Sequence, residues 1–354
     1  MKLYILLLFL LLVGMALVFY RVASQPVKVD NPDTLMVDFL QQYIRINTSH
    51  PKPNYKAACS FLMDKAITDG FSAQEVKLPS GYSAVIISYT GKNPSLPSVA
   101  LNHHMDVVPA TNTQEWASPP FAAEIHNDAI IGRGTQDMKG IGAVHYYALK
   151  SLKDAGIRPR RTVHLLVVPD EEVGGFKGTK LLVQSDEFKK LNIDTVVDEG
   201  VASGDEGLLL LKLTERRPIQ IEVTAKGQLA HGSHLTCHNA THYLVDFLGH
   251  LVGLHKQSQY TAQELQPGLL PSYNITSLTA GSTATLNVVP AWAKATVDIR
   301  IPPNMSLQEV IEDLNVSIKK HPSLTYTIKA MATEKSIEGL EKSLLYAKLE
   351  KACL

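Results

Sequence analysis

Residues 163–175 read VHLLVVPDEEVGG, an almost wholly apolar run of six residues followed by a proline, three acids, a valine and two glycines. A short continuous apolar run of this kind predicts a β-strand that is buried on both faces. Three acids at the end of a buried strand are costly unless a cation or solvent neutralises their charge. The stretch therefore predicts a strand whose carboxyl end carries a cation site or, in the simpler interpretation, a solvated acidic loop.

Similar strand-like runs lie at 84–89, 99–101 and 195–197, and amphipathic helical patterns such as 142–153 separate them. Short buried strands that alternate with helices predict an α/β fold with a sheet covered on both faces. In open sheets of this class, ligands bind outside the carboxyl ends of the strands. We therefore expect the functional residues where these strands end.

From residue 218 the pattern changes to strands that alternate apolar and polar residues, together with two amphipathic helices. Ser306 and Glu309 form a capping box at the start of the second of these helices. The order β-α-β-β-α-β is typical of a ferredoxin-like module, here inserted into the first domain. The predicted elements lie at 219–224, 241–255, 273–278, 293–301, 307–318 and 324–329.

Length and composition agree with a globular protein of two domains. The chain has 354 residues, of which 45% are hydrophobic, and this excludes a disordered chain. Its 34 Lys and Arg residues balance 34 Asp and Glu residues, which argues against electrostatic binding of nucleic acid. Three widely spaced cysteines exclude a disulfide framework and a CxxC zinc site. We expect a first domain of residues 27–212 plus 331–354 and a second of residues 213–330.

The first 26 residues are expected to be a signal peptide or a membrane anchor. An apolar run at 3–20 follows Lys2 and ends at Arg21, and its length is just enough for a short membrane span. Five Asn-x-Ser/Thr sequons fit a luminal or extracellular body; they begin at Asn47, Asn239, Asn274, Asn304 and Asn315. We therefore expect a secreted or membrane-anchored protein of the secretory pathway, with a cytoplasmic location as the alternative.

The first strand end with metal-binding residues is NHHMDVVP, residues 102–109. Because side chains alternate along an extended segment, His104 and Asp106 point the same way while His103 points away. This arrangement suits a zinc-ligating His104 whose other ring nitrogen is held by the carboxylate of Asp106. The simpler interpretation is a pair of polar surface histidines.

Three further motifs carry acids. GRGTQDMKG places Asp137 before a helix, as a metal ligand or an ordinary N-cap. Glu171 and Glu172 are adjacent and diverge, so one can bind a metal while the other acts as a general base. VDEG places Glu199 at the end of the last strand of the first domain. One imidazole among carboxylates is typical of a co-catalytic zinc pair, so the sequence predicts a metal-assisted hydrolase.

In this order, the motifs NHHMDVVP, GRGTQDMKG, PDEEVGG and VDEG resemble the M20 metallopeptidase family and, within it, the aminoacylases. The resemblance extends from about residue 33 to the end and includes further motifs at 51–55, 215–218, 227–231, 287–290 and 298–300. It implies a zinc-dependent exopeptidase-like catalytic domain with an inserted lid that also mediates homodimerisation. It further implies a small N-acyl-L-amino acid as substrate, hydrolysed to a carboxylate and an L-amino acid.

The resemblance implies two zinc ions at the carboxyl ends of the sheet. By this similarity His104 and Glu199 would bind one zinc, Asp137 would bridge both ions and Glu172 would bind the second. Asp198 is the alternative to Glu199 if the register is shifted by one residue. The second zinc site is expected to lack one ligand.

The resemblance also assigns roles around the metals. Glu171 would be the general base that activates the attacking water, and Asp106 would orient His104. In the lid, His231 would reach across a dimer to stabilise the oxyanion. Arg300 with Asn287 would hold the α-carboxylate of the substrate, a role that suits the planar donor fork of Arg.

The chain departs from the family in two places. His103 stands where relatives usually carry a small polar residue, and the chain ends at Leu354 before the histidine that completes the second zinc site. We therefore expect a truncated chain with an incomplete second site and impaired hydrolysis. The alternatives to an aminoacylase are an M20 carboxypeptidase or dipeptidase, a fatty-acyl amino-acid hydrolase or synthase, and a catalytically impaired dimerising homologue.

Overall fold

The computed structural model describes residues 32–200, 215–235, 238–261, 269–281, 286–332, 342 and 344–353. The chain divides into two compact units, residues 1–202 and 203–354, and each unit is described by itself. The predicted leader at 1–26 and the predicted boundary at 212/213 lie outside the described residues. Within the described ranges, none of the helices combines the length and the apolar character needed to cross a bilayer.

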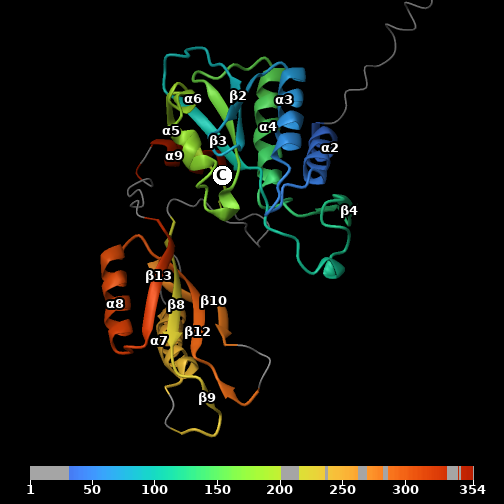
Figure 1. Ribbon diagram of the computed structural model, residues 1–354. Helices are drawn as coiled ribbons and strands as arrows, with labels where there is room; N and C mark the ends of the chain where they lie inside the picture. Colours follow the sequence, from blue (N-terminus) through green and yellow to red (C-terminus); the bar gives the residue numbers. More distant parts are fainter. Residues whose placement is uncertain are drawn as a thin grey trace, which may run out of the picture. The chain divides into compact units, whose positions relative to one another are not determined.

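The first unit contains a five-stranded mixed sheet in the order β1-β2-β6-β3-β7 (Figure 1). Strands β6, β3 and β7 run parallel to one another, whereas β1 and β2 pair antiparallel. The parallel strands therefore end at one edge of the sheet. The strands are β1 (Ser72–Lys77), β2 (Ser83–Tyr89), β3 (Ser98–His104), β6 (Val163–Val168) and β7 (Ile193–Val197).

Helices cover both faces of this sheet, as the alternation of strands and helices predicted. Alternate residues of β2 and β6 pack into two separate clusters, so the two faces are both buried. One cluster includes residues of α2 (Pro32–Arg45), α3 (Tyr55–Thr68) and α4 (Lys139–Asp154). The other includes residues of α5 (Thr179–Gln184) and α6 (Asp186–Lys189).

A small hairpin lies between β3 and α4 in the sequence. Strands β4 (Glu124–His126) and β5 (Ala129–Ile131) pair antiparallel, with His126 opposite Ala129. The two loop residues, Asn127 and Asp128, both have positive φ, as a two-residue hairpin turn of the primed type requires. A short 3-10 helix at Thr113–Glu115 precedes this hairpin.

The second unit has the predicted β-α-β-β-α-β order, with an antiparallel sheet in the order β10-β12-β8-β13. Its main elements are β8 (Arg217–Lys226), α7 (Ala240–Thr261), β10 (Ser272–Ala280), β12 (Trp292–Ile301), α8 (Leu307–Lys319) and β13 (Leu324–Met331). The predicted capping box of Ser306 and Glu309 is present at the start of α8. A separate pair, β9 (Ala230–His231) and β11 (Val288–Val289), extends the unit, and α9 (Leu344–Cys353) is the last element.

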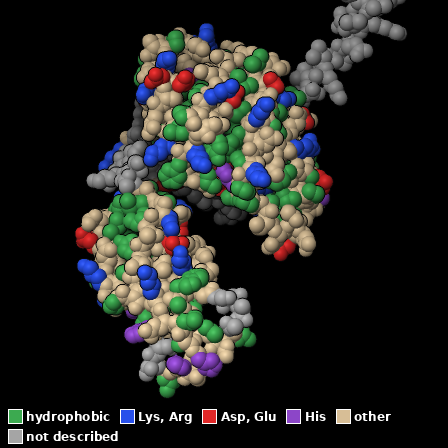
Figure 2. Space-filling view, in the orientation of Figure 1, with side chains coloured by type: hydrophobic (Ala, Val, Ile, Leu, Met, Phe, Trp, Pro, Cys, Tyr) green, Lys and Arg blue, Asp and Glu red, His purple; other side chains and the backbone are tan. Residues whose placement is uncertain are grey.

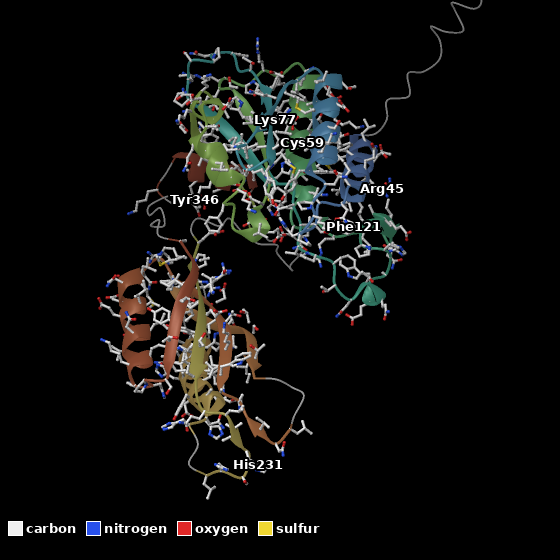
Figure 3. All side chains as sticks on the ribbon, in the orientation of Figure 1. Arg45, Cys59, Lys77, Phe121, His231 and Tyr346 are labelled. Carbon is white, nitrogen blue, oxygen red and sulfur yellow. The ribbon has the colours of Figure 1, made fainter. Side chains whose placement is uncertain are left out.

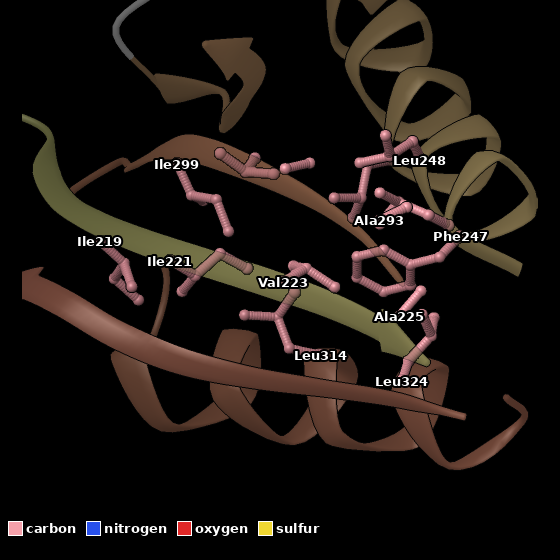
Figure 4. Packing of buried hydrophobic residues seen from close by; sticks show 14 of the residues in the cluster. Ile219, Ile221, Val223, Ala225, Phe247, Leu248, Ala293, Ile299, Leu314 and Leu324 are labelled. Carbon is pink, nitrogen blue, oxygen red and sulfur yellow. The ribbon is translucent and has the colours of Figure 1, made fainter. Parts of the chain in front are cut away.

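The core of the second unit lies on one face of its sheet. Alternate residues of β8, from Ile219 to Ala225, and of β12, from Ala293 to Ile301, are fully buried. They form one cluster with Phe247 and Leu248 of α7 and Leu314 of α8 (Figure 4). Both helices therefore cover the same face, and the period-two pattern of the strands specifies which residues point inward.

Candidate metal centre

Three strand ends and the start of a helix bring one histidine and four acids together. His104 is the last residue of β3, Glu171 and Glu172 follow β6, Glu199 follows β7 and Asp137 precedes α4. The Nε2 atom of His104 lies 2.9 Å from Asp137 Oδ1, 3.8 Å from Glu199 Oε2 and 3.9 Å from Glu171 Oε2. The sequence predicted that these side chains converge, because parallel strands end at a common edge of the sheet.

Two overlapping sets of these residues could each hold a metal ion. His104, Glu171 and Glu199 form one set, and His104, Asp137 and Glu172 form the other, with ligand atoms within 4.8 Å of one another. The histidine ring is 1% exposed, whereas the side chains of Asp137 and Glu171 are 64% and 53% exposed. The imidazole therefore forms the floor of a site whose acids face the solvent.

The crowding of carboxylates shows why a cation fits this site. Burial and the nearby charge of Asp137 raise the pKa of Glu172 to about 7. Burial also raises the pKa of Glu171, with further contributions from neighbouring acids that include Glu199. Like charges held this close oppose one another's ionisation, and a bound cation removes that cost.

The sequence predicted that the carboxylate of Asp106 holds His104, whereas in the structure the backbone carbonyl of Asp106 is the nearer partner. The Nδ1–H group of His104 donates to the backbone carbonyl of Asp106 at 2.9 Å, and the carboxylate oxygen Oδ1 is farther away at 3.4 Å. Burial alone would lower the pKa of His104, but bonds to Asp106, Asp137 and Glu199 raise it to about 12. With Nδ1 engaged by the carbonyl, Nε2 faces the acids, where a metal would bind.

The Asp106 carboxylate connects several parts of the site. It is completely buried and accepts the backbone N–H groups of Glu171 and Glu172, at 3.1 Å each. His50 Nε2 lies 2.9 Å from its Oδ2 atom. Burial would raise the pKa of Asp106, but these bonds and the one to His104 lower it. One carboxylate thus fixes the backbone that carries both glutamates.

Asp170, the first of the three consecutive acids, serves the loop rather than the metal site. It has a left-handed φ of 66° and is 1% exposed. Its carboxylate accepts the N–H groups of Lys177 and Gly178, at 2.7 and 3.0 Å. A Cβ atom at Gly178 would lie 2.2 Å from Asp170 Oδ1, so this close approach requires glycine. The acidic run therefore divides into one structural carboxylate and two at the site.

A buried lysine anchors the helix next to Asp137. The N-cap of α4 is Met138, without a side-chain bond, so Asp137 does not cap the helix. Lys139 is 0% exposed, and its ammonium donates to the carbonyls of Tyr43 and Ile46, at 3.0 and 2.8 Å. Burial lowers its pKa to about 7. These bonds hold the start of α4, and with it Asp137, against the end of α2.

The neighbours of the candidate ligands point elsewhere. His103 faces away from the site, as predicted, and its Nε2 atom lies 3.3 Å from the hydroxyl of Tyr43. Asp198, the alternative to Glu199, accepts the amide of Asn102 on both carboxylate oxygens at 3.0 Å. The structure therefore places Glu199, and not Asp198, beside His104.

The residues predicted for the lid lie at two ends of the second unit. Asn287 Nδ2 donates to His231 Nε2 at 3.1 Å, near the tip of the unit (Figure 3). Figure 2 shows histidine side chains gathered at that tip. Arg300 lies near the other end of β12, where it pairs with Asp298 at 2.7 Å. Asn287 is thus beside His231 rather than Arg300, and the substrate-binding roles of all three stay predictions.

The comparison with known families agrees with this arrangement. A model of peptidase family M20/M25/M40 matches residues 100–335, a range that includes every candidate ligand. The chain belongs to this family. M20 enzymes are metal-dependent hydrolases, and the two ligand sets around His104 provide this chain with a candidate metal centre.

The M20 chain is similar to aminoacylases in sequence. It is 36% identical to aminoacylase-1 of Sus scrofa over 281 residues, which cover 78% of this chain and 68% of that protein. It is 34% identical to aminoacylase-1 of Homo sapiens over 282 residues, with the same coverage. Among solved structures, an M20 family metallo-carboxypeptidase of Sulfolobus solfataricus aligns with a TM-score of 0.72 at 19% identity. That alignment covers 90% of this chain and 82% of the other, and it supports the fold alone.

Proposed function

We propose that this M20 chain is a zinc-dependent hydrolase that cleaves the amide bond of N-acyl-L-amino acids. The observation that supports this most directly is the pair of ligand sets that share His104 at the carboxyl edge of the sheet. One imidazole with several carboxylates suits zinc in a hydrolytic site. The choice of substrate is supported by the 36% identity to a protein named aminoacylase-1.

In the proposed reaction, His104, Asp137, Glu172 and Glu199 would hold the two metal ions. Zinc bound there would polarise the scissile carbonyl and make a nearby water more acidic. Glu171 would accept a proton from that water and pass it to the leaving nitrogen. Burial raises the pKa of Glu171, and this makes the carboxylate a stronger base. Asp106 fixes the backbone of Glu171 and thereby the position of this base.

The second unit would complete the substrate site. Arg300 would bind the α-carboxylate, for which its planar donor fork is suited. His231, which already accepts a hydrogen bond from Asn287, would stabilise the negative charge that develops on the carbonyl oxygen. We propose that this unit also forms a homodimer, so that these groups come from two copies of the chain.

The decisive experiment compares Glu171→Gln with Glu172→Gln in the zinc-loaded full chain. Because a general base typically contributes about 10²–10⁴ in rate, Glu171→Gln should lose that factor on N-acetyl-L-methionine. It should keep its zinc after dialysis, whereas Glu172→Gln should lose part of it. If Glu171→Gln alone lost its zinc, Glu171 would be the metal ligand and Glu172 the general base. Faster hydrolysis of an unblocked dipeptide than of N-acetyl-L-methionine by the parent would contradict the proposed substrate class.

A further inference from the structure

A cavity of about 560 Å³ opens in the first unit directly beside two of the proposed metal ligands. Its volume falls within the range of about 300–1,000 Å³ that is usual for pockets of small ligands. Asp137 and Glu172 form one wall, so a molecule in the cavity would touch the reacting centre. The remaining wall is built from Val108, Trp116, the end of the β4–β5 hairpin and the loop 132–136.

Four apolar residues from three segments line this cavity. They are Val108 after β3, Trp116 after the 3-10 helix, and Ile130 and Ile131 of β5. None of them belongs to the buried clusters on either face of the sheet, and Val108 is 37% exposed. Partly exposed apolar side chains around a hollow beside a polar centre are typical of a ligand pocket.

Arg133 supports the wall on which Trp116 lies. Its guanidinium carbon is 5.0 Å from the centre of the Trp116 ring, so the cation covers one face of the indole. Its Nε atom is buried without a hydrogen-bond partner among the described residues. Trp116 and Arg133 therefore line the same cavity as Asp137 and contact each other there.

We infer that this cavity binds the acyl chain of the substrate and that the enzyme prefers acyl groups longer than acetyl. The inference rests on the proposed function, since it names the part of an N-acyl amino acid that lies here. An acetyl group has a single methyl beyond the carbonyl and would leave most of the 560 Å³ empty. A linear or aromatic acyl group would instead cover Val108, Trp116 and Ile131 and remove their apolar surface from water.

The other candidate occupant is the α-carboxylate of the substrate, bound by the free edge of Arg133. The apolar wall argues against it, because a carboxylate beside Ile130 and Ile131 would lose hydration without gaining partners there. The acyl chain is therefore the occupant that the lining favours.

Trp116 allows the inference to be tested by binding. The chain has two tryptophans, and Trp292 lies in the second unit, so Trp292→Phe leaves Trp116 as the sole indole reporter. Adding Glu171→Gln prevents turnover during the measurement. This zinc-loaded double variant is titrated with N-acetyl-, N-butanoyl-, N-hexanoyl- and N-octanoyl-L-methionine. We expect the dissociation constant to fall about fourfold for each buried methylene, with a blue shift of the Trp116 emission.

One variant and a matched control locate the acyl chain. Ile131→Ala should reduce the ratio of octanoyl to acetyl affinity by about tenfold, because the apolar contact is removed. Ile125→Ala on the facing strand is the control. Ile125 is 52% exposed and does not line the cavity. The control should leave that ratio unchanged.

Equal affinity for the acetyl and octanoyl ligands would overturn the inference, as would no binding of any of them. A response that instead follows the free α-carboxylate, and that disappears in Arg133→Gln, would assign the cavity to the carboxylate. Hydrolysis by the parent chain separates this failure from that of the proposed function. If N-acyl amino acids are hydrolysed but Trp116 ignores acyl length, only the pocket assignment falls. If N-octanoyl-L-methionine binds with the Ile131 dependence while only dipeptides are hydrolysed, the proposed function falls, and the cavity is then a site for an apolar chain other than the acyl group of a substrate.

Discussion

Asp106→Asn is the most informative single substitution in the first unit, because it preserves shape and removes one acceptor. The two carboxylate oxygens accept the N–H groups of Glu171 and Glu172, and Oδ2 also contacts His50. In asparagine one of the two oxygens becomes an NH₂ group, so at least one of these N–H groups meets a donor. The side chain is 0% exposed, and water therefore cannot replace the lost acceptor.

The expected magnitude follows from these contacts. Leaving a buried donor unsatisfied costs about 1–3 kcal/mol, and a hydrogen bond to a charged group contributes about 1.5–3 kcal/mol. We therefore expect the free energy of unfolding to fall by about 2–3 kcal/mol. Because the Asp106 side chain also fixes the backbone of both glutamates, zinc affinity should fall by about 10–100-fold.

The assay combines urea unfolding with zinc competition against a chromophoric chelator. The matched control is Asp194→Asn, which removes the same charge from an exposed pair with Arg161. Water and salt screen that pair, so the control should unfold and bind zinc as the parent does. Surface substitutions usually change the free energy of unfolding by less than about 0.5 kcal/mol. If Asp106→Asn changes it by no more than this amount, the role assigned to this carboxylate is refuted. Unchanged zinc affinity would refute it as well.

Two further predictions concern stability away from the metal. Burial lowers the pKa of His164, which contacts Ser88 Oγ at 2.8 Å, so the unfolded chain takes up this proton first as the pH falls. Stability should therefore decline from about pH 6.5 downward, by up to about 1.4 kcal/mol per pH unit for this group, and His164→Asn should reduce that slope in urea titrations. In the second unit, Phe247→Ala removes a side chain that is 1% exposed and should cost about 3–5 kcal/mol in urea unfolding. The control is Val245→Ala on the same helix, because Val245 is 51% exposed. It should change the free energy of unfolding by less than about 0.5 kcal/mol. A His164→Asn slope equal to that of the parent, or equal losses in the two α7 variants, would contradict these assignments.

The sequence predicted the parts of the fold that depend on local pattern. The run 163–168 forms β6 over the same residues, because a continuous apolar strand must be buried on both faces. The convergence of His104 with Glu171 and Glu199 was also predictable, because parallel strands present their carboxyl ends at one edge. The βαββαβ order was predictable from sequence periodicity, since periods of two and of about 3.6 residues alternate along the chain.

The supports of the site could not be predicted in this way. His50 contacts Asp106 across 56 residues, and Lys139 reaches the carbonyl of Ile46 across 93 residues. Neither contact leaves a periodic trace in the sequence, because each joins a single side chain to a carboxylate or a backbone carbonyl far away along the chain. Asp170 was grouped with its two acidic neighbours, and only its left-handed backbone and its three N–H donors reveal a structural role.

The predicted lid roles also depend on spatial separation, which the sequence does not show. Within the sheet, Trp292 pairs with Lys226 and Arg300 with Pro218, so the two ends of β12 are separated by eight residues. At about 3.4 Å per residue this is roughly 27 Å, and His231 pairs with Val288, which precedes the Trp292 end of β12. In an N-acyl amino acid, the α-carboxylate is only three covalent bonds from the scissile carbonyl carbon. One copy of the second unit therefore cannot offer both Arg300 and His231 to the same substrate, and the proposed homodimer and these two roles stand or fall together.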